Sequence, residues 1–125
     1  MAVIELNKDN LEETINNNPF VIIDFWAPWC GPCQSFAPTF EKVSEEFPDV
    51  VFAKVNTEDE QEIAAHFQIR SIPTLMIFRD QIIIYAEAGA LPEPSLRQLL
   101  EQAAGLDMDD VRRQIAESQG GADQA

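Results

Sequence analysis

Both cysteines of the chain lie within the segment Trp29-Cys30-Gly31-Pro32-Cys33, and their spacing suits a disulfide that opens and closes. If Cys30 stands at the start of a helix and Cys33 one turn later, their Cα atoms come within the few ångströms that a disulfide requires. One thiol can then attack a substrate disulfide while the other completes the exchange. A Cys-x-x-Cys pair between a strand and a helix therefore predicts redox chemistry.

Two other uses of a cysteine pair are weaker. A structural zinc ion takes four protein ligands, and the sequence offers two cysteines, the single histidine His66 and no second cysteine pair. Carboxylates would have to complete such a site. A static disulfide between Cys30 and Cys33 would close a very short loop and constrain little of the unfolded chain. We predict a working dithiol, no metal site, and a surface position for His66.

Asp24 interrupts an otherwise apolar run from Phe20 to Trp26, which predicts a strand covered on both faces. Burial raises the pKa of a carboxyl group and lets it carry a proton near neutral pH, so Asp24 is a candidate base for Cys33. The alternative is a buried acid that hydrogen bonds or Lys54 on a neighbouring strand satisfy. For Lys54 itself, an exposed lysine is the simpler interpretation.

Composition sets the class of molecule. A chain of 125 residues predicts one domain, and 22 acidic against 8 basic residues give a net charge of −14, which should repel nucleic acid and anionic membranes. The segment Met1 to Glu5 lacks a signal-peptide pattern, and no apolar stretch is long enough to span a membrane. We expect a cytoplasmic protein, in a compartment that keeps thiols reduced.

Apolar periodicity and turn residues predict alternating strands and helices and then an adjacent strand pair, which indicates an α/β fold with a central mixed sheet and helices on both faces. The predicted strands are 3–6, 20–26, 50–56, 74–78 and 82–88, with a turn at 79–81 before the last one. The first predicted helix is capped by Asn7 or Asp9 and runs to about 17, and the others are 32–47, 58–67 and 93–104. Pro38 is placed to kink the second helix.

The chain divides into a domain, residues 1–105, and a C-terminal extension, residues 106–125. Residues 107–117 predict a short amphipathic helix with Met108, Val111 and Ile115 on one face, and 120–125 predict a disordered tail. Packing of this helix on the domain and contact with a partner both remain open.

Several separated segments resemble the thioredoxin family over about residues 1–105. They are the run from Asp24 to Cys33, Ala37-Pro38, Ala53 to Asn56, Ile72-Pro73-Thr74 and Gly89-Ala90. The resemblance implies the thioredoxin fold and a protein-disulfide reductase. Gln34 departs from the family pattern, in which a basic residue is common, and so does Ser71, where glycine is frequent.

The resemblance and helix electrostatics together make Cys30 the expected nucleophile, because a helix N-terminus stabilises a thiolate, and Cys33 the resolving thiol. Gly31 and Pro32 match the reductant version of the segment and would tune the redox potential. They also suit a plain strand-to-helix turn, and both interpretations hold together. The resemblance favours proton transfer by Asp24.

An X-Pro bond is usually trans, but the resemblance implies a cis bond before Pro73, next to the dithiol. Trp29, Ile72, Pro73, Gly89 and Ala90 would then line a shallow groove for a protein substrate. Core packing is the alternative for Ile72 and the preferred interpretation for Trp26.

The leading hypothesis is a monomeric thiol-disulfide oxidoreductase without a bound cofactor. Its electrons would come from NADPH through a flavin-dependent thioredoxin reductase, and its other partners would be disulfide-containing proteins. The alternative is an adaptor or co-chaperone of the same fold that holds client proteins, with a dithiol that serves regulation. The acidic extension is the feature that favours this alternative.

Overall fold

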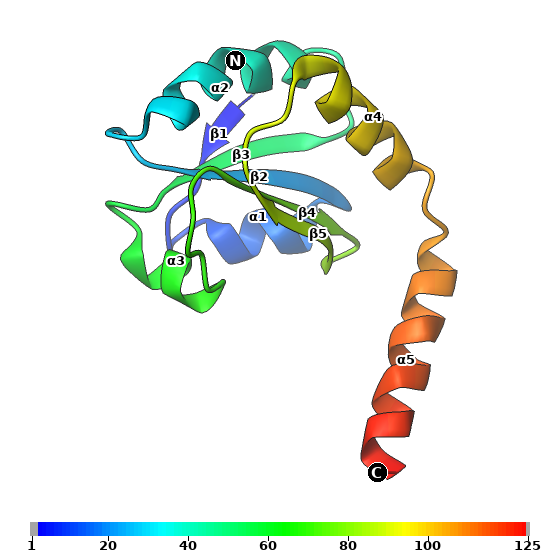
Figure 1. Ribbon diagram of the computed structural model, residues 1–125. Coiled ribbons are helices and arrows are strands. Elements are labelled where there is room, and N and C mark those ends of the chain that lie inside the picture. The colour runs from blue at the N-terminus through cyan, green and yellow to red at the C-terminus, as the bar shows by residue number, and fades with distance from the viewer. Residues whose placement is uncertain (1–2, 125) are drawn as a thin grey trace.

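The computed structural model describes residues 3–124, and it contains a five-stranded sheet covered by helices on both faces (Figure 1). The strands are β1 (Val3–Glu5), β2 (Phe20–Trp26), β3 (Val51–Asn56), β4 (Thr74–Arg79) and β5 (Ile82–Ala88). The helices are α1 (Leu11–Asn17), α2 (Gly31–Ser44), α3 (Gln61–His66), α4 (Glu93–Ala104) and α5 (Met108–Gln124). The predicted fold class and element order are confirmed.

The sheet has the strand order β1-β3-β2-β4-β5. β1 and β2 pair parallel with β3, whereas β4 pairs antiparallel with both β2 and β5. β2 is therefore the central strand, and this explains why its sequence is apolar with no polar alternation. The end of β2 leads through a short loop into α2, so the middle of the sheet positions the cysteine segment.

Alternate side chains of β2 enter two separate cores. Phe20 and Ile22 pack on the face that α2 and α4 cover, and Val21, Ile23 and Phe25 pack on the face that α1 and α3 cover. Figure 1 shows these two helix pairs on opposite sides of the sheet. Because side chains alternate along a strand, the acid that follows Ile23 in the sequence faces α2, the helix that carries the dithiol.

Local conformation sets two of the boundaries, one through a side chain and one through the backbone. α1 begins at Leu11, later than predicted, because the Asn7 Oδ1 accepts hydrogen bonds from the backbone N–H groups of Asp9 (2.8 Å) and Asn10 (3.1 Å) and holds a turn before the helix.

The predicted turn between the last two strands is present. Asp80 and Gln81 have φ values of 51° and 70°, the left-handed pair that a two-residue type I′ hairpin turn requires.

α5 leaves the body of the molecule after α4 (Figure 1). Asp107 caps its start, since Oδ1 accepts from the N–H groups of Asp109 and Asp110 at 3.1 and 3.2 Å, and Arg112 ties it to Asp80 at 2.9 Å. Its backbone continues to Gln124, which differs from the tail predicted at 120–125. The glycines at 120 and 121 each disfavour a helix by about 1 kcal/mol relative to alanine, but no proline or cap stops it before 124. Residue 125 lies outside the described residues.

Candidate active site

Cys30 occupies the N-cap position of α2, and a disulfide joins it to Cys33 in the first turn. The Cα atoms of the pair lie 5.2 Å apart, and Pro32 provides the fixed φ that suits a first helical turn. Both cysteines are nearly buried, with 5% of Cys30 and 2% of Cys33 exposed. The predicted pair is therefore present as a disulfide, in the position where a helix begins.

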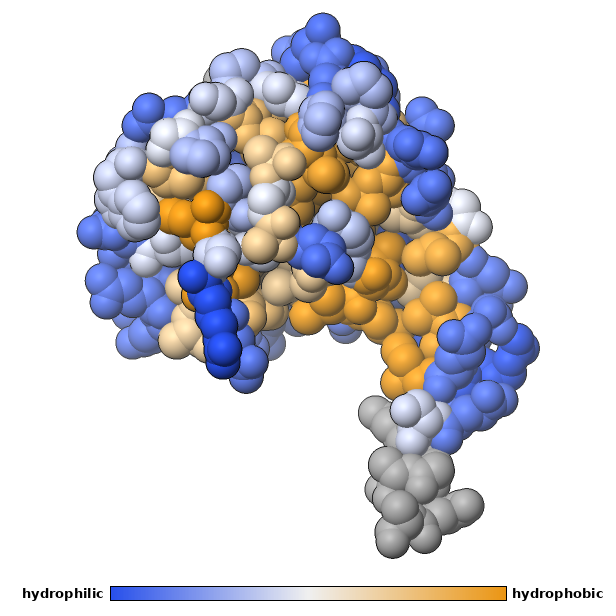
Figure 2. Space-filling model, in the orientation of Figure 1, coloured by the Kyte–Doolittle hydropathy of each residue, from blue (hydrophilic) through white to orange (hydrophobic). Residues whose placement is uncertain are grey.

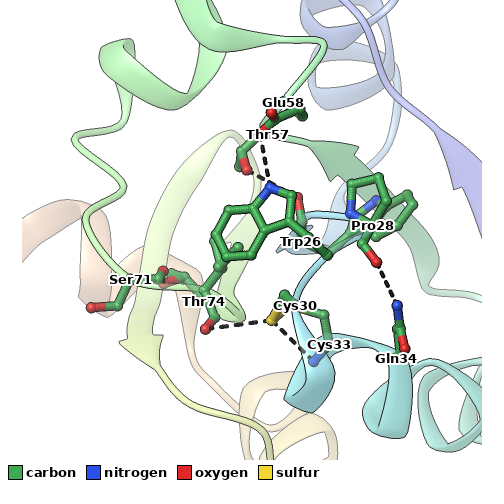
Figure 3. Close-up of a disulfide and its surroundings, with 11 residues drawn as sticks. Trp26, Pro28, Cys30, Cys33, Gln34, Thr57, Glu58, Ser71 and Thr74 are labelled. Atoms are coloured by element: carbon green, nitrogen blue, oxygen red, sulfur yellow. Dashed lines mark hydrogen bonds between the residues drawn. A yellow bond between two sulfur atoms is a disulfide. The ribbon is translucent and has the colours of Figure 1, made fainter.

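The start of α2 favours negative charge on the Cys30 sulfur. The backbone N–H of Cys33 points at the Cys30 Sγ, with a distance of 3.2 Å between nitrogen and sulfur (Figure 3). This N–H belongs to the helix terminus, where unpaired donors and the helix dipole attract an anion. When the disulfide is reduced, the arrangement stabilises a thiolate on Cys30.

A cis peptide bond joins Ile72 to Pro73, and this loop lies against the dithiol. The carbonyl oxygen of Ile72 lies 3.9 Å from the Cys30 Sγ, and Ile72 packs against the small buried cluster of Ala27, Cys30 and Cys33. The N–H of Gly89 donates to the carbonyl of Pro73 at 2.7 Å, and Gly89 has a φ of 107°, a conformation that favours glycine. The structure thus brings together Ile72, Pro73 and Gly89, and Ala90 follows as an exposed residue.

Trp29 is the most exposed large apolar side chain beside the dithiol, with 68% of its surface accessible. Its indole N–H donates to the Glu58 carboxylate at 2.9 Å. Thr57 holds the same loop in place, because its N–H and hydroxyl both donate to the carbonyl of Trp26, at 2.8 and 3.0 Å.

Sequence reasoning predicted no partner for the Trp29 side chain, so it missed Glu58. A usable signal exists, since Glu58 follows β3, which pairs parallel with β2. The carboxyl ends of parallel neighbours meet at one edge of a sheet, so the loops after β2 and β3 had to be neighbours.

Asp24 is buried at 4% exposure beneath the dithiol. Burial raises its pKa from 3.8 to about 7, and the positive charge of Lys54 opposes that rise. A cavity of about 240 Å³ lies beside it, lined by Asp24, Trp26, Cys33, Gln34, Ala37 and Lys54. The sequence-predicted acid therefore shares a cavity with the sequence-predicted resolving thiol.

Lys54 stands opposite Asp24 in the register of β2 and β3. Its ammonium group forms an ion pair with Glu5 at 3.7 Å and lies 5.2 Å from the centre of the Trp26 ring. The positive charge of Lys54 thus lowers the pKa of Asp24 without a direct ion pair. Lys54 also lines the cavity, so it is not simply a solvent-exposed lysine.

Gln34, at the position where the family often has a basic residue, donates from its side-chain amide to the carbonyl of Pro28 (Figure 3). It bridges the first turn of α2 to the loop before Cys30. His66 is exposed, as predicted. Within residues 3–124, no three His, Cys, Asp or Glu side chains cluster as metal ligands, and no helix is long and apolar enough to cross a membrane.

Comparison with known proteins identifies the family. A family model described as Thioredoxin matches residues 2–102. The chain is 52% identical over 121 residues to "Putative thioredoxin 2" of Streptomyces coelicolor, and this alignment covers 97% of this chain and 90% of that protein. It is 44% identical over 100 residues to "Thioredoxin C-3" of Corynebacterium nephridii, over 79% of this chain and 69% of that protein.

Among solved structures, a mutant thioredoxin from Halobacterium salinarum superimposes with a TM-score of 0.78 at 30% identity, over 84% of this chain and 93% of that one. The chain therefore belongs to the thioredoxin family and is a thiol-disulfide oxidoreductase with Cys30 and Cys33 as its redox pair.

Proposed function

We propose that this protein is a general reductant of protein disulfides in which Cys30 attacks, Cys33 resolves and Asp24 accepts the proton of Cys33. The observation that carries the proposal is the position of the Cys30 Sγ, which lies 3.2 Å from a helix N-terminal N–H and beside an exposed tryptophan. A nucleophile needs both a stabilised thiolate and access for its substrate.

In the proposed cycle the Cys30 thiolate attacks one sulfur of a substrate disulfide. A mixed disulfide forms, the substrate S–S bond breaks, and one substrate thiolate leaves. Asp24 then takes the proton of Cys33, whose thiolate attacks the Cys30 Sγ. The Cys30–Cys33 disulfide forms and the second substrate thiolate leaves, so two electrons pass from the protein to the substrate. A pKa of about 7 suits Asp24 to this transfer near neutral pH.

Substrate would lie across Trp29 and the Ile72-Pro73 loop. The Ile72 carbonyl beside the Cys30 sulfur supports this placement, because an extended substrate backbone can pair with it while its sulfur meets Cys30. Gly89 and Ala90 would form the far rim of the groove, and Gly31 and Pro32 would tune the potential through the geometry of the helix start.

Electrons would return to the disulfide from NADPH through a thioredoxin reductase in the cytoplasm, and the protein would act as a monomer with no bound cofactor. Residues 1–105 would form the catalytic domain and 106–125 an appended extension. The match of the family model to residues 2–102 supports this division. The alignment of 121 residues with the Streptomyces coelicolor relative reaches into the extension, so that relative also carries part of it.

The test is reduction of insulin disulfides by the full chain, driven by NADPH and thioredoxin reductase and separately by dithiothreitol. We expect turnover with either donor and none for Cys30→Ser. Failure of the intact protein with both donors would refute the general-reductase proposal, whereas failure with the enzyme alone would refute only the electron source.

The exposed apolar side of α5 supports a second candidate, an adaptor that holds client proteins. In α5, Met108 is buried but Ile115 is 37% exposed, Leu106 just before the helix is 40% exposed, and Figure 2 shows hydrophobic residues along one side of α5. The contact of Arg112 with Asp80 places α5 at the end of β4 remote from Thr74 and the dithiol. Client binding that survives Cys30→Ser and disappears when 106–125 are removed would favour the adaptor.

A further inference from the structure

A hollow of about 230 Å³ lies next to the cis-proline loop, on the face of the sheet that α1 and α3 cover. It shares no lining residue with the cavity beside Asp24. Ser71 and Thr74 line it and flank Ile72-Pro73 on the loop that approaches Cys30 (Figure 3), so the hollow continues the substrate groove. Its apolar wall consists of Phe67, Ile69, Met76, Ala86 and Ala88, and Gln68 and Arg70 complete its polar rim.

Two alanines of β5 leave this corner of the sheet open. Ala88 stands opposite Thr74 in the register of β4 and β5, and Ala86 stands opposite Met76, which packs in the core under α1 and α3. Both alanines are exposed, since a methyl group is too short to fill the space beyond the end of α3. Glu87 lies between them in sequence and therefore points to the other face of the sheet. Its carboxylate does not enter the hollow.

A turn after α3 carries Arg70 to the rim. Gln68 has a φ of 56°, its N–H donates to the carbonyl of Ala65 at 3.0 Å, and the N–H of Ile69 donates to that of Ala64 at 2.9 Å. These two bonds form a Schellman turn, in which the left-handed position usually holds glycine. The turn ends α3 and leaves Ile69 half-buried against the core and Arg70 exposed.

Within residues 3–124, Arg70 forms no ion pair and no side-chain hydrogen bond, and Lys8 is the other basic residue in that position. The remaining basic side chains bind a carboxylate or a backbone carbonyl: Lys42, Lys54, Arg79, Arg97, Arg112 and Arg113. A guanidinium with all its donors available matches the two oxygens of a carboxylate. The hollow thus combines an apolar wall with a rim that complements an acidic group.

We propose that this hollow is a specificity subsite: it takes an apolar side chain of the disulfide substrate, and Arg70 binds an aspartate or glutamate of the same segment. The inference rests on the proposed placement of the substrate along Ile72. An extended strand advances about 3.3 Å per residue, so a substrate paired with Ile72 passes Ser71 and Arg70 within a few residues of its reactive cysteine. The net charge of −14 favours basic partners over the whole surface, so recognition of an acid is local to Arg70.

The experiment uses short peptides whose cysteine forms a mixed disulfide with 5-thio-2-nitrobenzoate. Phenylalanine is placed two residues from the cysteine and glutamate, glutamine or lysine three residues from it, on the N-terminal side in one set and on the C-terminal side in another. Cys30 of the reduced full-length protein attacks the peptide sulfur, and thionitrobenzoate leaves as the thiolate. Cys33 then releases the peptide thiol, so one protein dithiol is oxidised for each peptide disulfide reduced.

In one of the two sets, the glutamate peptide should react about two- to fivefold faster than the glutamine peptide at low ionic strength, and the lysine peptide should be slowest. High salt should shrink these differences. Arg70→Glu should invert the order. Lys8→Glu is the matched control, because it reverses the other unpaired charge, which lies among the acids of 59–62, and it should keep the native order. No preference in either set, or inversion by both variants, would overturn the proposal.

The apolar wall is tested from an exposed position. Ala86→Leu fills the hollow, so it should slow the phenylalanine peptides more than peptides with alanine in place of phenylalanine. Equal rates for the two kinds of peptide in the native protein, or equal slowing by the variant, would show that no side chain enters the hollow.

A small neutral disulfide, 2,2′-dipyridyl disulfide, tests the dithiol alone. If the native protein reduces it but does not distinguish the peptides, the subsite is overturned and the reductase proposal stands. If the native protein does not reduce it, the reductase proposal fails and binding decides the subsite. Peptides with serine in place of cysteine are then titrated into the oxidised protein. Amide shifts at Arg70, Ala86 and Ala88 that the glutamate peptide loses in Arg70→Glu would support the subsite, and shifts confined to other residues would overturn it.

Discussion

Asp24 and Lys54 are register partners on β2 and β3, yet the Lys54 ammonium forms its ion pair with Glu5 rather than with Asp24. The carboxyl group of Asp24 therefore stays buried with a pKa near 7, because the charge of Lys54 offsets only part of the effect of burial. A fully formed ion pair would hold the acid ionised and remove its capacity to take up a proton.

Asp24→Asn should stabilise the protein above neutral pH. The pKa of Asp24 is about 7 when folded and 3.8 ordinarily, so between these values the unfolded chain loses the proton first and stability falls as pH rises. The destabilisation that Asp24 causes vanishes below pH 3.8, and above pH 7 it reaches about 4 kcal/mol in the free energy of unfolding. Urea unfolding from pH 4 to pH 8 should show this decline in the native protein and a much flatter profile in the variant. Parallel profiles would contradict the assignment.

Glu58→Ala should release the Trp29 ring without disturbing the dithiol. The indole N–H of Trp29 loses its charged acceptor, and 68% of the side chain is exposed, so the ring should become more mobile. Nitrogen-15 relaxation of the indole N–H should report faster motion, and KM for insulin should rise a few-fold with little change in kcat. Glu62→Ala, an exposed acid in α3, is the control. Equal effects of the two variants would exclude a specific role for Glu58.

Arg97→Met should loosen α4 from α2 at low salt. The guanidinium of Arg97 bonds Glu46 at 2.6 and 2.8 Å and Glu93 at 2.5 Å, and these bonds lower the pKa of both acids. These bonds stabilise the folded protein at pH values above 4.5, the ordinary pKa of both glutamates. The stabilisation is lost as the pH falls and the two carboxyl groups take up protons. We expect a small decrease in Tm at pH 7 that shrinks in 1 M NaCl and at pH 3. A decrease independent of salt would indicate lost packing.

A chain that ends at residue 105 should keep its reductase activity. The dithiol, Asp24 and the cis-proline loop all lie before the extension, and Arg112 contacts the hairpin turn at Asp80, remote from them. Tm should fall modestly, because the shortened chain loses the burial of the Met108 side chain. Insulin reduction and thermal melts of both lengths test this, and a large loss of turnover would assign the extension a catalytic role.

Local pattern predicted much of this architecture. Apolar runs and turn residues identified every strand and the first four helices within a few positions, and the break at Asp24 indicated a buried acid, but the last helix extends well beyond its predicted end at 117. The strand-to-helix transition likewise placed Cys30 at the start of α2. These features depend on periodicity and on residues that are close in sequence.

The remaining features depend on contacts between distant segments. The Glu58 partner of Trp29 follows from β2 and β3 lying side by side, and the pairing of Lys54 with Glu5 follows from β1 lying on the other side of β3. The cis bond at Pro73 was expected from family resemblance alone, since most X-Pro bonds are trans.

The most direct test of the central claim is capture of the mixed disulfide. Cys33→Ser leaves the proposed nucleophile without its resolving thiol, so incubation of the reduced variant with insulin should accumulate a covalent adduct. Mass spectrometry after proteolysis should place the bond on Cys30, and dithiothreitol should release it. Cys30→Ser should form little adduct under the same conditions. Adduct formation through Cys33 in Cys30→Ser, with none through Cys30, would contradict the assignment of the two thiols.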